Sequence, residues 1–353
     1  MEPRKKILVA PLGKGFGYAT RCIPIIEALE NHGFEPIIAS NGGALLLLQK
    51  EFPHLTTAEL PAYHLEYAKP EGLFSLKKVT QLVHMYRAIQ KEKKTVAQLV
   101  REMDIKGIIS DNRPGAYSKK VPSVFITHQV NILQGNLSGI ASHMHRSFFW
   151  RFTQCWVPDV KTGQNLSGKL GHTEEEIPNL RYIGTLSRLH KTNKDKKYDL
   201  AVIISGAEPH RSQLEEKLKP ALINYDGNVV LIRGIVETEQ TVYYTGHITE
   251  YNYMNSTMLE DVLNRSEMVL CRPSYSNIMD LAKLCKCAFF IPVPGNEEQE
   301  YLAKKMKKAM MAPYSKQESF KAEHLEKAKM YKGLRDINGL GKWKDLFSLF
   351  EGE

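Results

Sequence analysis

Short apolar runs alternate with longer amphipathic segments along most of this chain. In the first half, residues 6–11 form an apolar run, residues 19–31 carry apolar positions at helical spacing, and residues 35–40 form a second apolar run. A strand, a helix and a strand in this order build a parallel crossover. Further strands are expected at 107–110, 123–127 and 154–157. The first half therefore predicts a parallel sheet covered by helices.

The alternation restarts after residue 200 and predicts a second doubly wound α/β domain. Its clearest unit covers residues 267–306, where a helix is expected to begin near Ser274 or Ser276. The apolar positions of that helix follow the spacing i, i+3, i+4, i+7 of one buried face, at Ile278, Leu281, Ala282 and Cys285. Strands are expected at 200–205, 229–233, 241–245, 268–271 and 288–293, and helices at 213–223, 256–265, from 297, and at 315–331.

The length of the chain, 353 residues, suits two domains better than one hydrophobic core. The polar, glycine-containing segment 161–179 is interpreted as the connection between them. We therefore expect a first domain at 1–160, a second at 161–340, and a terminal helix at 341–353. That helix should pack back on the first domain through the apolar residues Trp343, Leu346, Phe347 and Phe350.

Composition narrows the classes of partner. The 48 Lys and Arg residues exceed the 39 Asp and Glu residues, which gives a net charge of +9. A basic protein suits nucleic acid, an anionic membrane surface or a phosphorylated small molecule, and no nucleic-acid-binding motif supports the first. The basic helix expected at 76–103 is interpreted either as a solvated face or as a peripheral membrane surface. Its cations are Lys77, Lys78, Arg87, Lys91, Lys93, Lys94 and Arg101.

The cysteines and the apolar runs favour a cytoplasmic protein. The five cysteines form no CxxC pair, so reduced thiols are expected. No signal-peptide pattern and no apolar run long enough to span a bilayer are seen. The expected location is the cytoplasm, with the inner face of the cytoplasmic membrane as a possible site of action.

A glycine loop follows the first strand, at Gly13, Gly15 and Gly17. Glycines at this position let the backbone approach a ligand closely. The loop fails the dinucleotide fingerprint GxGxxG because Tyr18 occupies the position of its third glycine. The second strand also ends without the acidic residue that would bind a ribose. No NAD, FAD or other cofactor is therefore expected.

Two polar residues stand at the carboxyl ends of predicted strands, where the ligand crevice of a parallel sheet lies. They are Asp111 and His128, and each has a structural alternative, as a turn cap or as a buried histidine. The pair His143 and His145 lacks a third nearby metal ligand, and the chain has no Asp-x-Asp. No metal site is predicted.

The helix expected near Ser274 and Ser276 opens with groups that suit an anion. Its free N–H groups can bind phosphate, although either serine can also act only as an N-cap. Arg272 precedes the helix and offers a cation of phosphate-matching geometry.

Several of these motifs together resemble glycosyltransferase family 28. They are Gly13-Lys-Gly-Phe-Gly-Tyr-Ala-Thr-Arg-Cys-Ile-Pro, Ser205-Gly-Ala-Glu-Pro-His-Arg, Arg272-Pro-Ser-Tyr-Ser-Asn-Ile-Met-Asp-Leu-Ala and Pro294-Gly-Asn-Glu-Glu-Gln-Glu-Tyr-Leu-Ala. The family includes the lipid II-forming N-acetylglucosaminyltransferase and predicted bacterial glycosyltransferases. The resemblance implies the GT-B fold, in which two Rossmann-like domains face a central cleft.

The resemblance also implies an activity and a site. We expect inverting, metal-independent transfer of a sugar from a UDP-sugar to a hydroxyl of a glycan or lipid-linked acceptor, in bacterial envelope glycan or glycolipid synthesis. The implied site for the nucleotide sugar comprises Gly206, Arg211, Arg233, Arg272, Ser274, Tyr275, Ser276, Asp280, Glu298, Gln299 and Glu300. Within it, Asp280 would accept ribose hydroxyls, and the three residues 298–300 would bind sugar hydroxyls.

One position departs from the family pattern, because Tyr18 stands where a histidine usually follows the loop glycine. The ordinary pKa of tyrosine, about 10, makes it a poor base near neutral pH, although it can hydrogen-bond a phosphate or an acceptor. Asp111 is the first candidate to replace that histidine, and His128 the second. Three alternatives stay open: a nucleotide-sugar hydrolase of the nonulosonate type, a catalytically silent sugar or lipid binder, and a sugar-epimerising relative.

Overall fold

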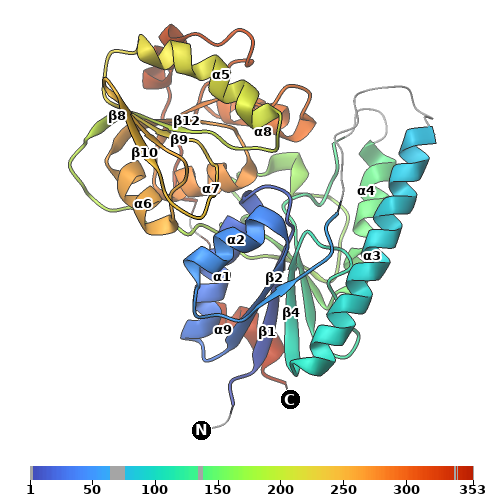
Figure 1. Ribbon diagram of the computed structural model, residues 1–353. Helices are drawn as coiled ribbons and strands as arrows, with labels where there is room; N and C mark the ends of the chain where they lie inside the picture. Colours follow the sequence, from blue (N-terminus) through green and yellow to red (C-terminus); the bar gives the residue numbers. More distant parts are fainter. Residues whose placement is uncertain (1–2, 64–75, 134–137, 338, 340, 353) are drawn as a thin grey trace.

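The computed structural model describes residues 3–63, 76–133, 138–337, 339 and 341–352. Among these residues, the first domain has a seven-stranded, wholly parallel sheet in the order β3-β2-β1-β4-β5-β6-β7 (Figure 1). The strands are β1 (Lys6–Pro11), β2 (Glu35–Ser40), β3 (Thr57–Glu59), β4 (Ile105–Asp111), β5 (Ser123–Ile126), β6 (Gln154–Val157) and β7 (Leu180–Tyr182). The strand order turns outward from β1 in both directions, which is the doubly wound arrangement.

The second domain contains a six-stranded sheet within the described residues, in the order β10-β11-β9-β8-β12-β13. Its strands are β8 (Tyr198–Ile203), β9 (Val229–Ile232), β10 (Val242–Thr245), β11 (Ile248–Tyr251), β12 (Ser266–Cys271) and β13 (Cys287–Phe290). All neighbours are parallel except β10, an edge strand that pairs antiparallel with β11. The fold class expected from the sequence, two Rossmann-like α/β domains, is confirmed.

Helices connect and cover the strands. They are α1 (Gly17–Asn31), α2 (Gly42–Glu51), α3 (Leu76–Glu102), α4 (Ser138–Arg146), α5 (His210–Ile223), α6 (Ser256–Asn264), α7 (Tyr275–Lys283), α8 (Glu297–Lys308) and α9 (Trp343–Phe347), with 3₁₀ turns η1 (Phe149–Arg151), η2 (Gly168–Leu170), η3 (Ala322–Met330) and η4 (Ser348–Phe350). Of the four apolar positions expected on α7, Ile278, Leu281 and Ala282 are at most 1% exposed, whereas Cys285 lies beyond the end of the helix and is exposed.

The first domain extends past the expected boundary at residue 160. Strand β7 pairs with β6, so the sheet continues to Tyr182. The polar segment before β7 is folded against the domain by Asp159, whose buried carboxylate accepts hydrogen bonds from the backbone N–H groups of Val160, Leu166 and Ser167. The polar composition of this segment suggested a linker, but the buried carboxylate of Asp159 accepts hydrogen bonds from its backbone N–H groups and holds it against the first domain. The connection to the second domain lies after β7 and before β8.

The end of the chain crosses back to the first domain. Phe347 and Phe350, on α9 and η4, make edge contacts with Phe34, and Phe347 also with His32. A helix was expected at 315–331, and this was wrong, since the segment contains the 3₁₀ turn η3. The buried residues of η3, Leu325 and Ala328, are three positions apart. That spacing fits the three residues per turn of a 3₁₀ helix.

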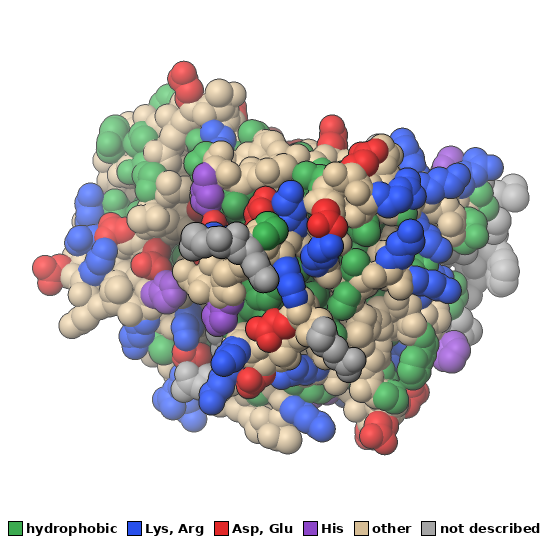
Figure 2. All heavy atoms as spheres, turned by 90° about the horizontal axis from the view of Figure 1, so that it is seen from below, with side chains coloured by type: hydrophobic (Ala, Val, Ile, Leu, Met, Phe, Trp, Pro, Cys, Tyr) green, Lys and Arg blue, Asp and Glu red, His purple; other side chains and the backbone are tan. Residues whose placement is uncertain are grey.

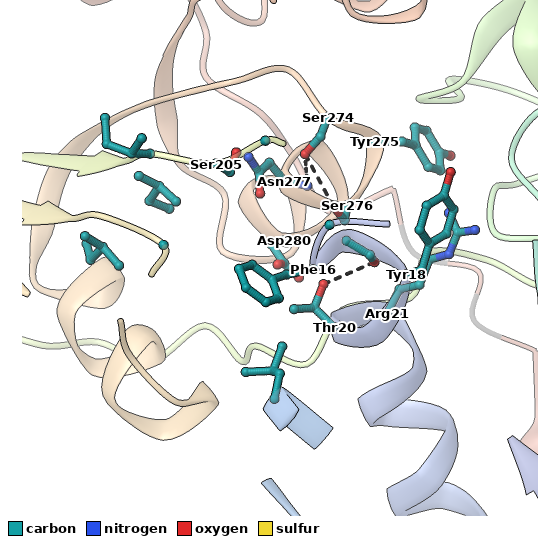
Figure 3. A pocket seen from close by; sticks show the side chains of 18 of the residues that line it. Phe16, Tyr18, Thr20, Arg21, Ser205, Ser274, Tyr275, Ser276, Asn277 and Asp280 are labelled. Atoms are coloured by element: carbon teal, nitrogen blue, oxygen red, sulfur yellow. Dashed lines mark hydrogen bonds between the residues drawn. The ribbon is translucent and has the colours of Figure 1, made fainter. Parts of the chain in front are cut away.

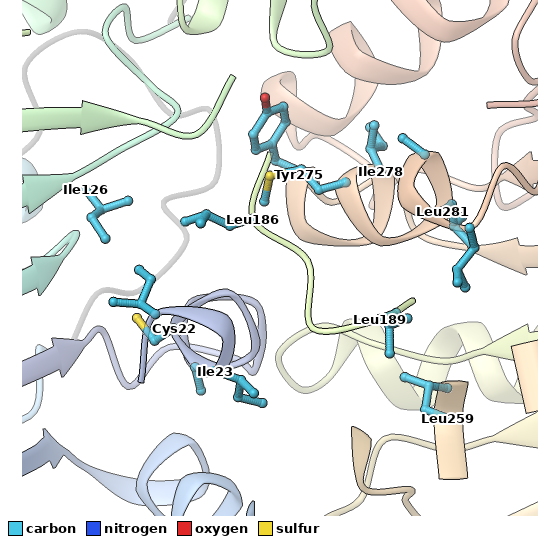
Figure 4. Close-up of a cluster of buried hydrophobic side chains, with 14 of the residues drawn as sticks. Cys22, Ile23, Ile126, Leu186, Leu189, Leu259, Tyr275, Ile278 and Leu281 are labelled. Carbon is cyan, nitrogen blue, oxygen red and sulfur yellow. The ribbon is translucent and has the colours of Figure 1, made fainter. Parts of the chain in front are cut away.

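A single hydrophobic cluster joins the two domains (Figure 4). It includes Cys22 and Ile23 of α1, Leu186 and Leu189 of the connection, and Ile278 of α7. Helices α1 and α7 are therefore packed against each other across the domain boundary. This packing fixes how the starts of these two helices are placed, and the candidate site lies there.

Candidate functional site

A cavity of about 240 Å³ lies between the two domains. The first domain contributes the glycine loop, the start of α1, and His128. The second contributes the loops that follow β8, β9 and β12, together with the start of α8. The cavity thus lies at the carboxyl ends of strands from both sheets, where open α/β sheets bind their ligands.

The N-terminal ends of α1 and α7 meet at this cavity (Figure 3). A Cβ atom on Gly17 would lie 2.7 Å from Oγ of Ser276, so the absence of a side chain at Gly17 permits the contact. Ser274 is the N-cap of α7 and accepts a hydrogen bond from the N–H of Asn277. Among the described residues, no side chain caps α1. Two helix starts with unpaired N–H groups favour an anion between them.

The loop after β8 forms a second stretch of backbone at the cavity wall, at Ser205, Gly206 and Ala207. Gly206 has a φ of 119°, a value that favours glycine. This conformation leaves the wall free of a side chain at that point. The glycine turn expected from the motif at Ser205 therefore lies at the cavity wall.

The connection between the domains contributes a cationic side chain to the cavity lining. Arg188 lines the cavity, its side chain is 8% exposed, and it donates to Oγ of Ser256 at 3.0 Å. It also pairs with Glu51 at 3.5 Å. Within the described part of the chain, its Nε atom has no hydrogen-bond partner. A guanidinium held at the wall of a cavity suits recognition of phosphate.

Asp280 lines the same cavity one turn into α7. Its carboxylate accepts a hydrogen bond from Oγ of Ser187 at 2.6 Å. Burial raises the pKa of Asp280 to about 6, although Arg188 and Ser187 oppose that rise. A carboxylate facing a cavity can accept hydrogen bonds from a diol such as ribose.

Part of the cavity lining is apolar. It includes Ile203, Ile232, Val236, Met254, Leu259 and Leu263, together with Tyr253. Apolar walls with a few placed polar groups are typical of small-molecule sites. The cavity therefore combines helix starts and polar side chains with an apolar lining.

A chain of charged and polar side chains crosses the cleft between the domains. Asp111 is fully buried and forms a bidentate ion pair with Arg21. Nη1 of Arg21 lies 2.8 Å from Nδ1 of His128, and Nε2 of His128 lies 2.7 Å from Oε1 of Glu298 on α8. Burial alone would raise the pKa of Glu298, but His128 and Arg21 outweigh it and hold that pKa below its ordinary value.

Tyr18 lies beside this chain of charges. Its hydroxyl accepts a hydrogen bond from Nδ2 of Asn112 at 3.0 Å, and the Arg21 guanidinium lies 4.8 Å from its ring centre. Burial, reinforced by the negative charge of Glu298, raises the pKa of Tyr18 well above its ordinary value. The phenol is therefore neutral and cannot act as a base near neutral pH.

The structure brings most of the predicted site residues to the cavity. Those that line it are Gly15, Gly17, Tyr18, His128, Gly206, Ser274, Tyr275, Ser276, Asp280, Glu298 and Gln299. Those outside its lining are Gly13, Asp111, Arg211, Arg233, Arg272 and Glu300. Gly13 still has a local reason, since a Cβ there would lie 2.4 Å from Oδ1 of Asn41.

The three predicted arginines are occupied elsewhere. Arg272 is fully buried and donates to the carbonyl oxygens of His210, Ile291 and Pro292. Arg211 and Arg233 share the carboxylate of Glu215 in a network of ion pairs. The expected role of Arg272 as the phosphate cation does not fit this geometry, because both terminal nitrogens of its guanidinium already have partners in the fold.

Arg21 and Arg188 line the cavity but were not among the predicted site residues. Arg21 stands four positions after Gly17 and therefore lies on the same face of α1, which a helical projection can reveal. Arg188 stands in an irregular connection without periodicity, so its place at the cavity depends on how the two domains pack.

Two further properties bear on the kind of site. In the described ranges, no group of three or more His, Cys, Asp or Glu side chains could hold a metal ion. Within the same ranges, no helix has both the length and the apolar character to cross a membrane.

Known proteins share this architecture. Residues 201–335 match the sequence profile of the glycosyltransferase family 28 C-terminal domain. No curated protein sequence matches the chain significantly. Similar solved structures include a UDP-glucosyltransferase from Polygonum tinctorium (10% identity, TM-score 0.62, 99% of both chains), MurG from Acinetobacter baumannii (12%, 0.57, 99% of both) and SsfS6 from Streptomyces sp. SF2575 with thymidine diphosphate (12%, 0.54, 88% of both).

At these identities the likeness establishes the fold, which is GT-B. The matched profile is more specific than the fold. It covers residues 201–335 of the second domain and belongs to the family that the sequence motifs resemble.

Proposed function

We propose that this protein is an inverting, metal-independent glycosyltransferase that uses a UDP-sugar. The observation that carries the proposal is the meeting of two helix starts at one cavity, with Arg188 and Asp280 beside them. The diphosphate lies between the starts of α1 and α7, and the ribose hydroxyls donate hydrogen bonds to Asp280. The uracil base lies against the apolar side chains of the cavity lining. Gln299 and Glu298, at the start of α8, bind the sugar.

The reaction needs positive charge where the leaving diphosphate develops negative charge. N–H groups of α1 and α7, the backbone of residues 205–207, and the guanidinium of Arg188 supply it. Preorganised donors of this kind stabilise a transition state because they need no rearrangement as charge develops. Metal independence is thus a proposal that rests on these donors, and activity in the presence of EDTA tests it.

The proton of the acceptor hydroxyl must pass to a group that lines the cavity. Asp111 is removed from it by full burial and by its ion pair with Arg21. Tyr18 keeps its own proton because its pKa is raised. Asp280, which also lines the cavity, is assigned to the ribose hydroxyls. The pair formed by His128 and Glu298 therefore remains, and one of its members receives the proton.

A nucleotide panel tests the donor site. UDP, GDP, dTDP and UDP-sugars are added to the protein in EDTA, and thermal unfolding is followed. A ligand at a hundred times its dissociation constant adds about 2.7 kcal/mol of stability, and UDP should give the largest shift. Absence of a shift with every nucleotide would overturn the proposal.

Release of UDP from UDP-sugars separates the alternatives. Release that requires an added hydroxyl acceptor supports a transferase. Release that proceeds equally without an acceptor identifies a hydrolase, isomerised UDP-sugar without transfer identifies an epimerising relative, and binding without any reaction identifies a silent binder.

We also propose that the acceptor is lipid-linked and that the first domain contacts an anionic membrane, in keeping with envelope glycan or glycolipid synthesis. Helix α3 exposes Val83, Tyr86, Arg87, Lys91 and Lys94 at helical spacing. Figure 2 shows Lys and Arg side chains gathered on the side of the molecule where α3 lies in Figure 1. Basic residues beside exposed apolar side chains favour the surface of an anionic bilayer.

Sedimentation with lipid vesicles tests this surface. The protein should bind vesicles that contain phosphatidylglycerol more than vesicles of phosphatidylcholine, and Arg87→Glu/Lys91→Glu should abolish the difference. Lys316→Glu/Lys321→Glu, a charge reversal at exposed residues of the second domain, is the matched control. Equal binding by both double variants would refute the proposed surface.

A further inference from the structure

The neighbours of His128 determine which of its ring nitrogens carries hydrogen. Nη1 of Arg21 lies 2.8 Å from Nδ1 of the ring. A guanidinium can only donate, so Nδ1 must accept through its lone pair. On the other side, Nε2 lies 2.7 Å from Oε1 of Glu298. An ionised carboxylate can only accept, so Nε2 must carry the hydrogen. Both neighbours specify the same tautomer.

The ring and its arginine are held in place. Tyr275 stacks on the imidazole with ring centres 4.6 Å apart and an angle of 8°, and its hydroxyl donates to the carbonyl of Pro158 at 2.8 Å. Arg21 is fixed by its bidentate ion pair with Asp111 and by the Tyr18 ring. Neither partner of the contact between Arg21 and His128 can turn away without disrupting buried structure.

We propose that Arg21 is a positioning residue that locks His128 in the Nε2–H tautomer, so that Glu298 rather than His128 receives the proton of the acceptor. This inference rests on the proposed glycosyl transfer and deepens it. With a hydrogen already on Nε2 and Arg21 on Nδ1, the imidazole has no free lone pair toward the cleft. It serves as a hydrogen-bond donor.

Glu298 has the properties that the step requires. It lines the cavity, and its two oxygens accept separate hydrogen bonds, from His128 at 2.7 Å and from Nε2 of Gln129 at 2.6 Å. These bonds orient the carboxylate, and its lowered pKa keeps it ionised near neutral pH. The acceptor oxygen gives its proton to a Glu298 oxygen and bonds to the anomeric carbon. The bond from that carbon to the phosphate oxygen breaks, and its electron pair leaves with UDP.

The test is a nitrogen-15 NMR spectrum of histidine-labelled protein at pH 8.5, where an imidazole of ordinary pKa is neutral. His128→Asn identifies the His128 signals by their disappearance. We expect the wild-type protein to show hydrogen on Nε2 and none on Nδ1. A spectrum with hydrogen on Nδ1, or one averaged over both tautomers, would overturn the inference.

Two variants determine which neighbour provides the lock. Arg21→Lys keeps the charge beside Asp111 but loses the fork that reaches His128. Combined with Glu298→Ala, which removes the other neighbour, it should give a mixture of tautomers. Glu298→Ala should leave the Nε2–H tautomer unchanged, because Arg21 remains. If Glu298→Ala alone changes the tautomer, Arg21 is not the lock. Should Arg21→Lys fail to fold, the wild-type and Glu298→Ala spectra still decide.

The same samples separate this inference from the proposed function. UDP is titrated into each, and binding is followed by calorimetry. Wild-type protein that binds UDP but shows the wrong tautomer refutes the lock and leaves the nucleotide site intact. Protein with the expected tautomer and no affinity for any nucleoside diphosphate refutes the glycosyltransferase proposal instead.

Discussion

Two arginines, Arg272 before α7 and Arg188 in the connection between the domains, lie near the cleft but have different surroundings. Arg272 precedes α7 within the motif, yet it lies outside the cavity lining, and its guanidinium binds three backbone carbonyl groups and Gln317. Arg188 belongs to no motif and lines the cavity beside Asp280. Each leaves its Nε without a partner in the described residues, but only Arg188 faces space for a ligand.

The difference shows that closeness to a motif in sequence does not assign a binding role. Burial without a carboxylate partner lowers the pKa of Arg272 to about 10, so its charge costs free energy that the surrounding carbonyl groups must offset. Its position joins the ends of β12 and β13 to the start of α5. Arg272 therefore supports the second domain, and we propose that Arg188 supplies the phosphate-binding cation that the sequence analysis expected of Arg272.

Loss of Arg272 should give the largest effect, and the effect should be on stability. Arg272→Ala leaves three backbone carbonyl groups and the side chain of Gln317 without their donor, and each unsatisfied buried group costs about 1–3 kcal/mol. We expect a loss of about 3 kcal/mol or more in the free energy of unfolding, measured by urea denaturation. The folded fraction should still bind UDP. Unchanged stability together with lost UDP affinity would show that Arg272 binds the ligand and would contradict its structural role.

Loss of Arg188 should act on the ligand instead. A hydrogen bond to a charged group contributes about 1.5–3 kcal/mol, so Arg188→Ala should weaken UDP binding by about 10- to 100-fold. Isothermal titration calorimetry measures the change. Arg265→Ala is the matched control, because Arg265 pairs on the surface with Asp261, and it should leave the affinity unchanged. Equal affinities for both variants would remove Arg188 from the site.

The pH dependence of UDP binding should follow Asp280. Its pKa is raised to about 6, so the free protein holds this proton more tightly than the unfolded chain, and it loses stability as pH rises from about 4 to 6. Ribose hydroxyls need the ionised carboxylate as acceptor, so UDP affinity should rise from pH 5 to pH 7 by up to about tenfold per unit below the pKa. Asp280→Asn should weaken binding and flatten the profile. An equally steep profile in the variant would assign the titration to another group.

The smallest effect is expected at the cap of α7. Ser274→Ala removes the side chain that accepts from the N–H of Asn277, and loss of such a cap costs about 1 kcal/mol. The thermal midpoint should fall by a few degrees. Because the N–H groups at the helix start remain, UDP affinity should change less than in Arg188→Ala. A larger loss of affinity than at Arg188 would make the hydroxyl of Ser274 a ligand in its own right.

What the sequence could predict depended on local determinants. The strands, the buried face of α7 and its cap at Ser274 follow from neighbouring residues, and the glycine at position 17 signalled a close approach. No local feature of the sequence indicated that His128 lines the cavity and Asp111 does not. Asp111 is the last residue of β4 and stays within the sheet, whereas His128 lies two residues beyond β5 and reaches the cleft. A shift of strand ends by two residues determines which side chain meets the ligand.

Tertiary packing accounts for the rest. Arg188 reaches the cavity only because Leu186 and Leu189, on either side of it, are buried in the cluster that joins the domains. Glu298 meets His128 only because the two sheets face each other. Neither contact is encoded by spacing along the chain, since 170 positions separate Glu298 from His128.

The return of the chain's end to the first domain constrains how the protein can be made. Phe347 and Phe350 complete a core whose other walls, among them Phe34, were synthesised more than 300 residues earlier. During translation, an apolar surface of the first domain therefore stays uncovered until residues 343–350 have been synthesised. A variant truncated before Trp343 would leave that surface uncovered, so the first domain completes its core only after the second domain has been synthesised.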